Sequence, residues 1–205
     1  MRKDIKMKKI IFATGNKDKM REIREIMVDV DVEVISMKEA GISVDVEENG
    51  TTFEENSLIK ARANAEHTDA IVLADDSGLE IDYLDKAPGV YSARFMGEDT
   101  SYEIKNQALI DKLEGVAKEE RTARFVCAIA AVLPDKSDIV VRENMEGYIG
   151  YHAEGENGFG YDPIFFLDEF GCSSAALSRE QKNAISHRGK AIRVMKDILL
   201  ERGTL

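Results

Sequence analysis

Hydrophobic residues recur with two different periods along the chain, which predicts a protein built from both strands and helices. Strand patterns cover residues 8–14, 32–35, 70–74, 79–82, 122–133 and 139–149. Helical spacing covers residues 17–28, 52–66, 99–113 and the chain from about 178 onward. The turn residues Pro134 to Ser137 join the last two strand patterns and predict a hairpin. We therefore expect an α/β fold with a mixed sheet in one compact body over residues 1–205, with residues 1–6 as a short N-terminal overhang.

Composition and charge narrow the choice of partners. The 205 residues include 39 acidic and 28 basic ones, so the formal net charge is −11. Such a surface disfavours nucleic acid, whose binding depends on clustered Lys and Arg. No stretch is long and apolar enough for a membrane span, and the charged N-terminus does not resemble a secretory signal. The two cysteines show no metal-binding spacing, and we expect them to stay reduced in a cytoplasm.

The apolar run Ala70–Ala74 leads directly into two acids, a hydroxyl and a glycine at residues 75–78. We expect the strand to end there, so that Asp75 and Asp76 lie in a turn at its carboxyl end, where α/β sheets gather ligands. Paired carboxylates suit Mg²⁺, which shares its coordination shell with water and substrate phosphates. Alternatively, the acids only cap a turn. The pair Glu47–Glu48 is a second source of carboxylate, although by itself it is typical of a solvated charge run.

Residues 14–19 lie between a predicted strand and a predicted helix, where free backbone N–H groups and the helix dipole favour an anion. Gly15 lets the backbone approach a ligand, Asn16 can cap the helix, and Lys19 can reach back to a phosphate. The same residues also suit an ordinary turn with an asparagine cap. Neither a Walker loop nor a dinucleotide fingerprint is present.

Two later segments carry further candidate residues. In Gly158–Pro163, two glycines flank Phe159, so the ring is carried on backbone that can lie against a planar ligand, and aromatic faces stack on nucleobases. The alternative is a turn whose aromatic residues pack in the core. In Lys182–Lys190, His187 and Arg188 are adjacent and can share one pocket only at a helix start, with Ser186 as the cap. The alternative there is a solvated basic helix.

Taken together and in this order, five motifs resemble those of the inosine triphosphate pyrophosphatases, also called dITP/XTP pyrophosphatases. They are Thr14-Gly15-Asn16-x-x-Lys19, Ala74 to Leu79, Pro88 to Arg94, Gly158 to Pro163 and Ser186 to Gly189. The resemblance runs from about Met7 to Leu200. It departs at Asp85-Lys86, where many members have two glycines, and at Cys172 to Ala176.

The resemblance implies an elongated two-lobed α/β fold with a long central mixed sheet flanked by helices, and a nucleotide in the cleft between the lobes. It implies a Mg²⁺-dependent homodimer that hydrolyses ITP, dITP and XTP to the monophosphate and pyrophosphate. Asp76 would be the proton acceptor and a metal ligand. Glu47 matches the other metal carboxylate, and the adjacent Glu48 is the alternative for the same role. The substrate-binding residues would be Thr14, Gly15, Asn16, Lys17, Asp18 and Lys19 at the triphosphate, then Ser77, Phe159, Gly160, Tyr161, Asp162 and Lys182, and His187 and Arg188 on the base side.

Three rival functions remain on sequence grounds. A nucleotide-binding regulator would need the glycines and aromatics but not the acids. A phosphatase that works through an aspartyl-phosphate would need an Asp-x-Asp loop after the first strand, where this chain has Thr14-Gly15-Asn16. A pyrophosphatase for pyrimidine or modified nucleotides is the nearest enzymatic alternative, and the His187-Arg188 motif argues against it.

Overall fold

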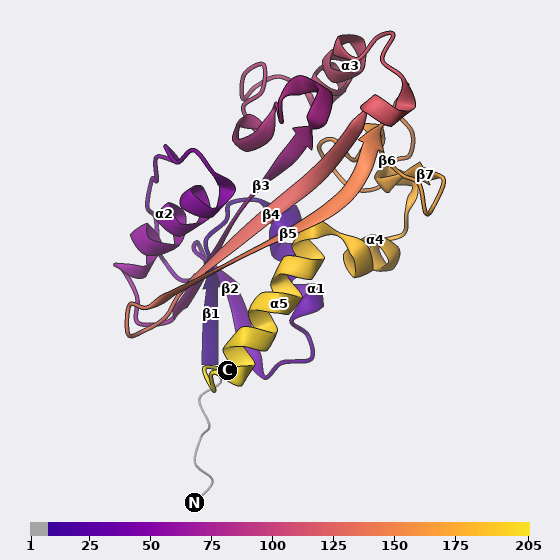
Figure 1. The fold of residues 1–205 in the computed structure, drawn as a ribbon. Coiled ribbons are helices and arrows are strands. Elements are labelled where there is room, and N and C mark those ends of the chain that lie inside the picture. The colour runs from indigo at the N-terminus through magenta and orange to yellow at the C-terminus, as the bar shows by residue number, and fades with distance from the viewer. Residues whose placement is uncertain (1–7) are drawn as a thin grey trace, which may run out of the picture. The chain divides into compact units, whose positions relative to one another are not determined.

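The computed structural model describes residues 8–205, and Figure 1 shows its helices and strands. The predicted overhang at residues 1–6 lies outside the described residues. Seven strands form one sheet in the order β2-β1-β3-β4-β5-β6-β7. The strands are β1 Lys8–Phe12, β2 Val32–Ser36, β3 Ile71–Ile81, β4 Thr122–Val132, β5 Asp138–Ile149, β6 Phe165–Leu167 and β7 Cys172–Ser173. The α-helices are α1 Lys17–Ile26, α2 Phe53–Ala65, α3 Tyr102–Lys112, α4 Arg179–Ile185 and α5 His187–Glu201.

The sheet is mixed, as predicted. Strand β1 pairs in parallel with both β2 and β3, whereas β6 pairs antiparallel with β5 and β7. Strands β4 and β5 are neighbours joined by a tight turn, in which the Leu133 N–H donates to the Ser137 carbonyl. The α/β fold class and the hairpin are therefore confirmed.

The described chain divides into two compact units. Unit 1 comprises the residues up to Asp76, Ala128–Arg142 and Gly189–Leu205, and unit 2 comprises Ser77–Cys127 and Glu143–Arg188. Strands β3, β4 and β5 and helix α5 contribute residues to both units. The single two-lobed domain expected from the sequence stays a prediction.

In unit 1 the two faces of the sheet bury alternate residues, because successive side chains of a strand point to opposite faces. Ile11 and Ala13 pack with Val72 of β3 and with Ala61 and Ala65 of α2. Ile10 and Phe12 on the other face are also fully buried. Figure 1 shows α2 on one side of these strands and α1 and α5 on the other. This sandwich of helix, sheet and helix holds the amino ends of α1 and α2 in fixed places.

Unit 2 has its own hydrophobic core. Leu109 of α3 and Leu113 directly after it are fully buried against Leu79 and Ile81 of β3, and Tyr161 and Phe165 belong to the same cluster. Since Tyr161 and Ile164 are core residues, the chain directly after the Gly158–Gly160 loop is anchored in this core.

The expected strand end at Asp75 is wrong, because β3 continues without a turn from Ile71 to Ile81 and includes the segment predicted as a separate strand at 79–82. The physical reason lies in the neighbouring strands. Strand β1 pairs with β3 only as far as Leu73, whereas β4 is another strand of 11 residues on the other side. The acids therefore lie beyond the carboxyl end of β1 while their own strand runs on.

The Asp85-Lys86 departure lies in the turn that follows β3. Asp85 has φ 50° and Lys86 has φ 68°, both in the left-handed region that favours glycine. Two glycines would adopt this conformation at lower cost.

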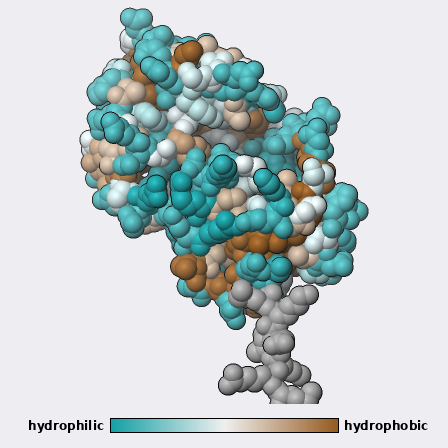
Figure 2. Space-filling model, turned by 180° about the vertical axis from the view of Figure 1, so that it is seen from behind, coloured by the Kyte–Doolittle hydropathy of each residue, from teal (hydrophilic) through white to brown (hydrophobic). Residues whose placement is uncertain are grey.

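The hydropathy of the surface and of the helices can be compared with the composition. The face shown in Figure 2 is mainly hydrophilic, with a smaller gathering of hydrophobic residues low in the view. Among residues 8–205, no helix has the length and hydropathy that crossing a membrane requires.

Candidate functional site

The first group of candidate side chains lies in unit 1, and we call it the acid–lysine cluster. It consists of Lys19 from α1, Glu48 from the loop before α2, Asn56 and Lys60 from α2, and Asp75 and Asp76 from β3. It forms where β1 stops. The Ala13 N–H still donates to the Leu73 carbonyl, and the chain then turns into α1, which brings the start of that helix to the acids of β3.

The turn before α1 is an asparagine-capped helix start. The Asn16 Oδ1 accepts hydrogen bonds from the backbone N–H groups of Asp18 at 2.8 Å and Lys19 at 3.2 Å. The Lys19 Nζ does not reach back to this turn but lies 2.9 Å from the Asp75 Oδ2. Asp18 pairs with Arg21 along the helix, and Lys17 is exposed. A Cβ added at Gly15 would meet nothing within 4 Å, so open space adjoins the backbone there.

Asp76 is a partly buried carboxylate. Its Oδ2 accepts a hydrogen bond from the Asn56 Nδ2 at 3.1 Å, and the Asn56 Oδ1 accepts one from the Gly50 N–H at 2.8 Å. Burial raises the pKa of Asp76 from its ordinary value of 3.8 to about 6, and the charge of Glu48 acts in the same direction. Lys60, Asn56 and Lys19 lower that pKa but do not overcome the effect of burial. A carboxyl group shifted in this way is a mark of functional sites.

Of the two glutamates before α2, Glu48 is the one that the structure brings to Asp76. Glu48 is half-buried, its Oε1 lies 3.0 Å from the Lys60 Nζ, and its charge acts on Asp76. Glu47 is exposed. The Lys60 Nζ also donates to the Asp75 carbonyl at 2.9 Å, so one lysine joins both acidic segments.

The shifted pKa has a consequence for stability that can be measured. Because folded Asp76 binds a proton more tightly than unfolded Asp76, stability falls as pH rises from 3.8 toward and through about 6. In metal-free buffer at pH 8, we expect Asp76→Asn to raise the free energy of unfolding by at most about 3 kcal/mol, because the amide carries no charge to desolvate. The gain should vanish below pH 4. Urea unfolding of the wild type and the variant at the two pH values measures it, and a wild type that is more stable than the variant at pH 8 would contradict it.

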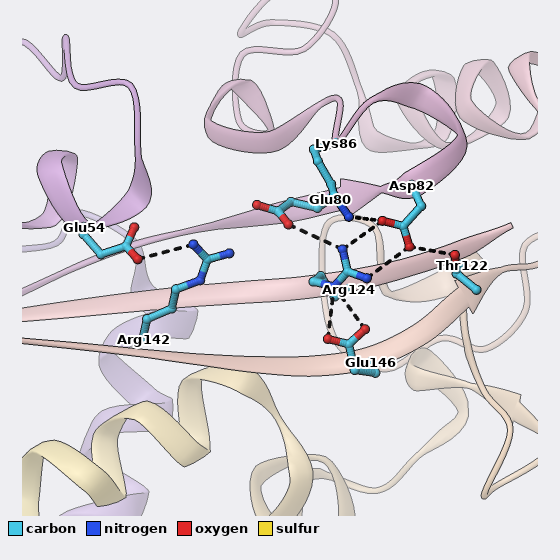
Figure 3. Close-up of polar contacts among 8 residues, drawn as sticks. All are labelled: Glu54, Glu80, Asp82, Lys86, Thr122, Arg124, Arg142 and Glu146. Atoms are coloured by element: carbon cyan, nitrogen blue, oxygen red, sulfur yellow. Dashed lines mark hydrogen bonds and ion pairs between the residues drawn. The ribbon is translucent and has the colours of Figure 1, made fainter. Parts of the chain in front are cut away.

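The acidic residue directly after β3, Asp82, behaves in the opposite way. In unit 2, the Arg124 guanidinium lies 3.0 Å from Asp82, 3.0 Å from Glu146 and 3.7 Å from Glu80 (Figure 3). Lys86 and Thr122 also contact Asp82, and these partners hold the pKa of Asp82 well below its usual range. We interpret this neutralised group as structural. The Asp76 carboxylate differs because burial outweighs its partners.

The second group of candidate side chains lies in unit 2, and we call it the phenylalanine-loop group. It consists of Phe159, Asp162, Ser174, Lys182 and Arg188. The ring of Phe159 is partly exposed, with the Lys182 Nζ 5.2 Å and the Arg188 guanidinium carbon 5.7 Å from its centroid. An aromatic ring with two nearby cations suits a planar, electron-rich ligand that carries negative charge.

Two other predicted residues of unit 2, His187 and Ser77, adjoin Arg188 of this group. His187 and Arg188 are the first two residues of α5, as a shared pocket requires, and Ser186 precedes them with extended backbone. The His187 ring stacks on Phe125 at 5.0 Å. The Arg188 Nη2 donates to the Ser77 Oγ at 3.0 Å.

Tyr161 is a core residue whose hydroxyl is already used within the protein. The side chain is buried, and its hydroxyl donates to the Ser92 carbonyl at 2.7 Å. Tyr161 therefore fits the alternative in which this aromatic packs in the core.

Three residues of these groups escaped the sequence interpretation: Asn56, Lys60 and Ser174. Asn56 and Lys60 are four residues apart on α2, so they share one helix face, and this spacing next to the Glu47–Glu48 pair is a signal that was present. Ser174 stands in a segment without a distinctive pattern, and only the fold brings it to Asp162.

The donor set of the acid–lysine cluster fits Mg²⁺ held jointly with a phosphate ligand. Within residues 8–205, no three His, Cys, Asp or Glu side chains gather in a way that could hold a metal ion by themselves. Asp76 and Glu48 supply two carboxylates whose charges repel, and a hard divalent cation relieves that repulsion. Mg²⁺ typically uses one or two carboxylates and takes its remaining oxygens from water and substrate.

Known proteins share both the fold and the sequence. The solved structure of a Ham1 protein from Coxiella burnetii matches with a TM-score of 0.87 and 38% identity, covering 95% of this chain and 100% of that one. The Staphylococcus aureus Ham1 protein matches with a TM-score of 0.86 and 41% identity, with 95% and 100% covered. This chain therefore has the α/β fold of these two Ham1 proteins.

The sequence comparisons make the assignment specific. A dITP/XTP pyrophosphatase of Caldanaerobacter subterraneus is 49% identical over 197 residues, which cover 96% of this chain and 98% of the relative. One of Clostridium perfringens is 46% identical over 199 residues, with 94% and 98% covered. The model of the Ham1 family matches residues 10–198. The chain belongs to the Ham1 family, which confirms the resemblance inferred from the five motifs.

Proposed function

We propose that this protein hydrolyses non-canonical purine nucleoside triphosphates, namely ITP, dITP and XTP, to the nucleoside monophosphate and pyrophosphate. The observation that carries the proposal is the Asp76 carboxylate, which is partly buried, has a raised pKa and lies among two lysines, an amide and a second acid. Such a group suits proton transfer near neutral pH. Relatives that match nearly the whole chain are named dITP/XTP pyrophosphatases, which supports the same activity.

The acid–lysine cluster is proposed to act on the phosphates. Asp76 accepts the proton of the attacking water as the bond between the α- and β-phosphorus atoms breaks. Lys19 and Lys60 offset the negative charge that gathers there, and the backbone N–H groups at residues 14–16 bind phosphate oxygens. When bound, Mg²⁺ supplies charge neutralisation and polarises a phosphoryl oxygen, with Asp76 and a glutamate of the 47–48 pair as its protein ligands. The structure favours Glu48 for that role, since its charge acts on Asp76.

The phenylalanine-loop group is proposed to act on the base. Phe159 stacks on the purine, and Lys182, His187 and Arg188 present donors to its polar edge. Hypoxanthine and xanthine carry an acceptor at position 6, whereas adenine carries an amino donor there. A site built on donors therefore rejects ATP, because a buried donor would face another donor.

Three further parts of the proposal concern the setting of the reaction. We propose Mg²⁺ as the cofactor, a homodimer as the assembly and the cytoplasm as the compartment. The family resemblance implies all three, and the acid-rich composition agrees with a small-molecule substrate rather than nucleic acid.

The proposal predicts a selective, metal-dependent release of pyrophosphate. Purified protein is incubated with ITP, XTP, GTP, ATP and UTP, with Mg²⁺ or with EDTA, and pyrophosphate and free phosphate are measured separately. We expect kcat/KM for ITP and XTP to exceed that for ATP by about 10²-fold or more, and EDTA to abolish turnover.

The possible outcomes separate the rival functions. Binding of nucleotides without turnover would indicate a regulator, and free phosphate instead of pyrophosphate would indicate a phosphatase. Preference for UTP would indicate a pyrimidine pyrophosphatase. Equal rates for ATP and ITP would overturn the donor pocket while leaving pyrophosphate release intact.

A further inference from the structure

The carboxylate of Asp162 is engaged on both oxygens by groups of its own chain. Its Oδ2 accepts hydrogen bonds from the Phe159 N–H at 2.8 Å and from the Lys182 Nζ at 2.5 Å, and its Oδ1 accepts one from the Ser174 Oγ at 2.6 Å. The residue is 2% exposed. Three donors from the loop, from α4 and from the segment after β7 therefore meet on one buried carboxylate.

The glycine before Phe159 is explained by this carboxylate. Gly158 has φ +76°, and a Cβ at that position would lie 2.3 Å from the Asp162 Oδ2. Any other residue would displace the carboxylate as well as strain the backbone. Gly158 is thus required by the chain's own packing, whereas the sequence interpretation ascribed the glycines to close approach of a ligand.

The loop is also held from α3. The Asn106 Nδ2 donates to the Gly160 carbonyl at 3.1 Å, so buried side chains hold the loop backbone at the Phe159 N–H and again one residue after Phe159. The Phe159 ring itself remains partly exposed. Because the backbone that carries the partly exposed ring is already held in place, less conformational entropy is lost when a base binds.

The same carboxylate places a cation beside the ring. Lys182 is 8% exposed. Its Nζ donates to the Asp162 Oδ2 and lies 5.2 Å from the centroid of the Phe159 ring. Burying that ammonium is costly without a partner, and Asp162 supplies one. The Asp162 side chain therefore holds both the loop backbone at Phe159 and the Lys182 ammonium group.

We infer that Asp162 is a positioning residue for base recognition, which holds Phe159 and Lys182 in the arrangement that receives the purine and does not itself contact the substrate. The purine part of this inference rests on the proposed function. The holding of the loop stands on the contacts of the substrate-free protein alone.

The experiment compares three variants by two readouts. Asp162→Asn replaces an acceptor by an amide whose N–H would face the donors of Phe159 or Lys182. Ser174→Ala removes the donor to the Oδ1, together with a longer contact of 3.3 Å to the Asp162 carbonyl, and leaves both donors to the Oδ2 in place. Ser173→Ala is the matched control, because Ser173 is equally buried and its Oγ donates to the Glu154 carbonyl at 2.6 Å, away from Asp162. The readouts are hydrogen exchange of the Phe159 amide without ligand, and KM and kcat for ITP with Mg²⁺.

We expect Asp162→Asn to accelerate exchange of the Phe159 amide and to raise KM for ITP by about tenfold each, with a smaller loss in kcat. Ser174→Ala should show both effects at about threefold, and Ser173→Ala should show neither. If Asp162→Asn does not fold, the two serine variants still decide the question.

Two results would overturn the inference. One is a raised KM in Asp162→Asn with unchanged amide exchange and a Ser174→Ala variant like wild type, which would show that Asp162 contacts the substrate directly. The other is unchanged KM in both Asp162→Asn and Ser174→Ala although the wild type hydrolyses ITP. If the wild type does not hydrolyse ITP, the proposed function fails separately, and the exchange rates alone then support or overturn the holding of the loop.

Discussion

Replacing Asp76 by asparagine is expected to lower kcat for ITP by about 10²–10⁴-fold, the usual contribution of a general base. The amide cannot accept the proton of the attacking water, and it is a poor ligand for Mg²⁺ compared with a carboxylate. The variant should fold, because the amide keeps the size of the side chain and an oxygen for the Asn56 N–H. Pyrophosphate release measured against circular dichroism and thermal unfolding checks both parts.

A control and a second property make this result specific. Asp69→Asn removes an exposed carboxylate just before the same strand and should leave kcat unchanged. Activity with Mg²⁺ should fall in Asp76→Asn, while stability in metal-free buffer at pH 8 rises, as the raised pKa requires. A misfolded variant would lose both properties, so the opposite signs exclude that explanation. Near-full turnover in Asp76→Asn would remove Asp76 from its proposed role.

Features that depend on neighbouring residues in the chain were predictable from the sequence. The start of α2 was expected at Thr52, and the Thr52 side chain does accept from the Glu55 N–H. The Glu55 carboxylate accepts from the Thr51 N–H at 2.7 Å and not from the Thr52 N–H, so Thr52 and Glu55 do not form a complete capping box. The asparagine cap of α1 was also expected, because a cap bonds only to N–H groups within three residues.

Features that depend on distant strands were not predictable in the same way. Asp75 and Asp76 have low strand propensity and are followed by Ser77 and Gly78, which favoured a turn. Pairing on the sheet overrides that local preference, since β4 continues beside β3 after β1 has ended. The two acids therefore do lie beside the end of a strand, but that strand is β1 and not their own strand β3.

Asp162 illustrates why roles are harder to predict than positions. Its motif with flanking glycines was interpreted as a ligand contact, because glycine commonly permits close approach. Its partners Ser174 and Lys182 follow 12 and 20 residues later, so their donation to one carboxylate is a property of the folded chain. The sequence identifies the residue as a candidate, and the contacts assign it a positioning role.

Lys60 offers the second large expected effect, since it contacts both acidic segments of the acid–lysine cluster. Its Nζ lies 3.0 Å from the Glu48 Oε1 and 2.9 Å from the Asp75 carbonyl, and its charge opposes the raised pKa of Asp76. In Lys60→Met, Glu48 and Asp76 lose the cation that lies between their segments. We expect kcat/KM for ITP to fall by about 10²-fold, comparable to the loss of one preorganised donor in other active sites.

The matched control for this variant is Lys136→Met. The Lys136 Nζ also donates to a backbone carbonyl, that of Ala65 in α2 at 2.7 Å, but Lys136 does not belong to the acid–lysine cluster. Equal losses in the two variants would mean that Lys60 only stabilises α2. If Lys60 acts through charge, raising the Mg²⁺ concentration should recover part of the activity of Lys60→Met, because the metal and the lysine offset the same carboxylates. A loss that is independent of Mg²⁺ would instead indicate that the lysine acts by holding the loop of Glu48 in place.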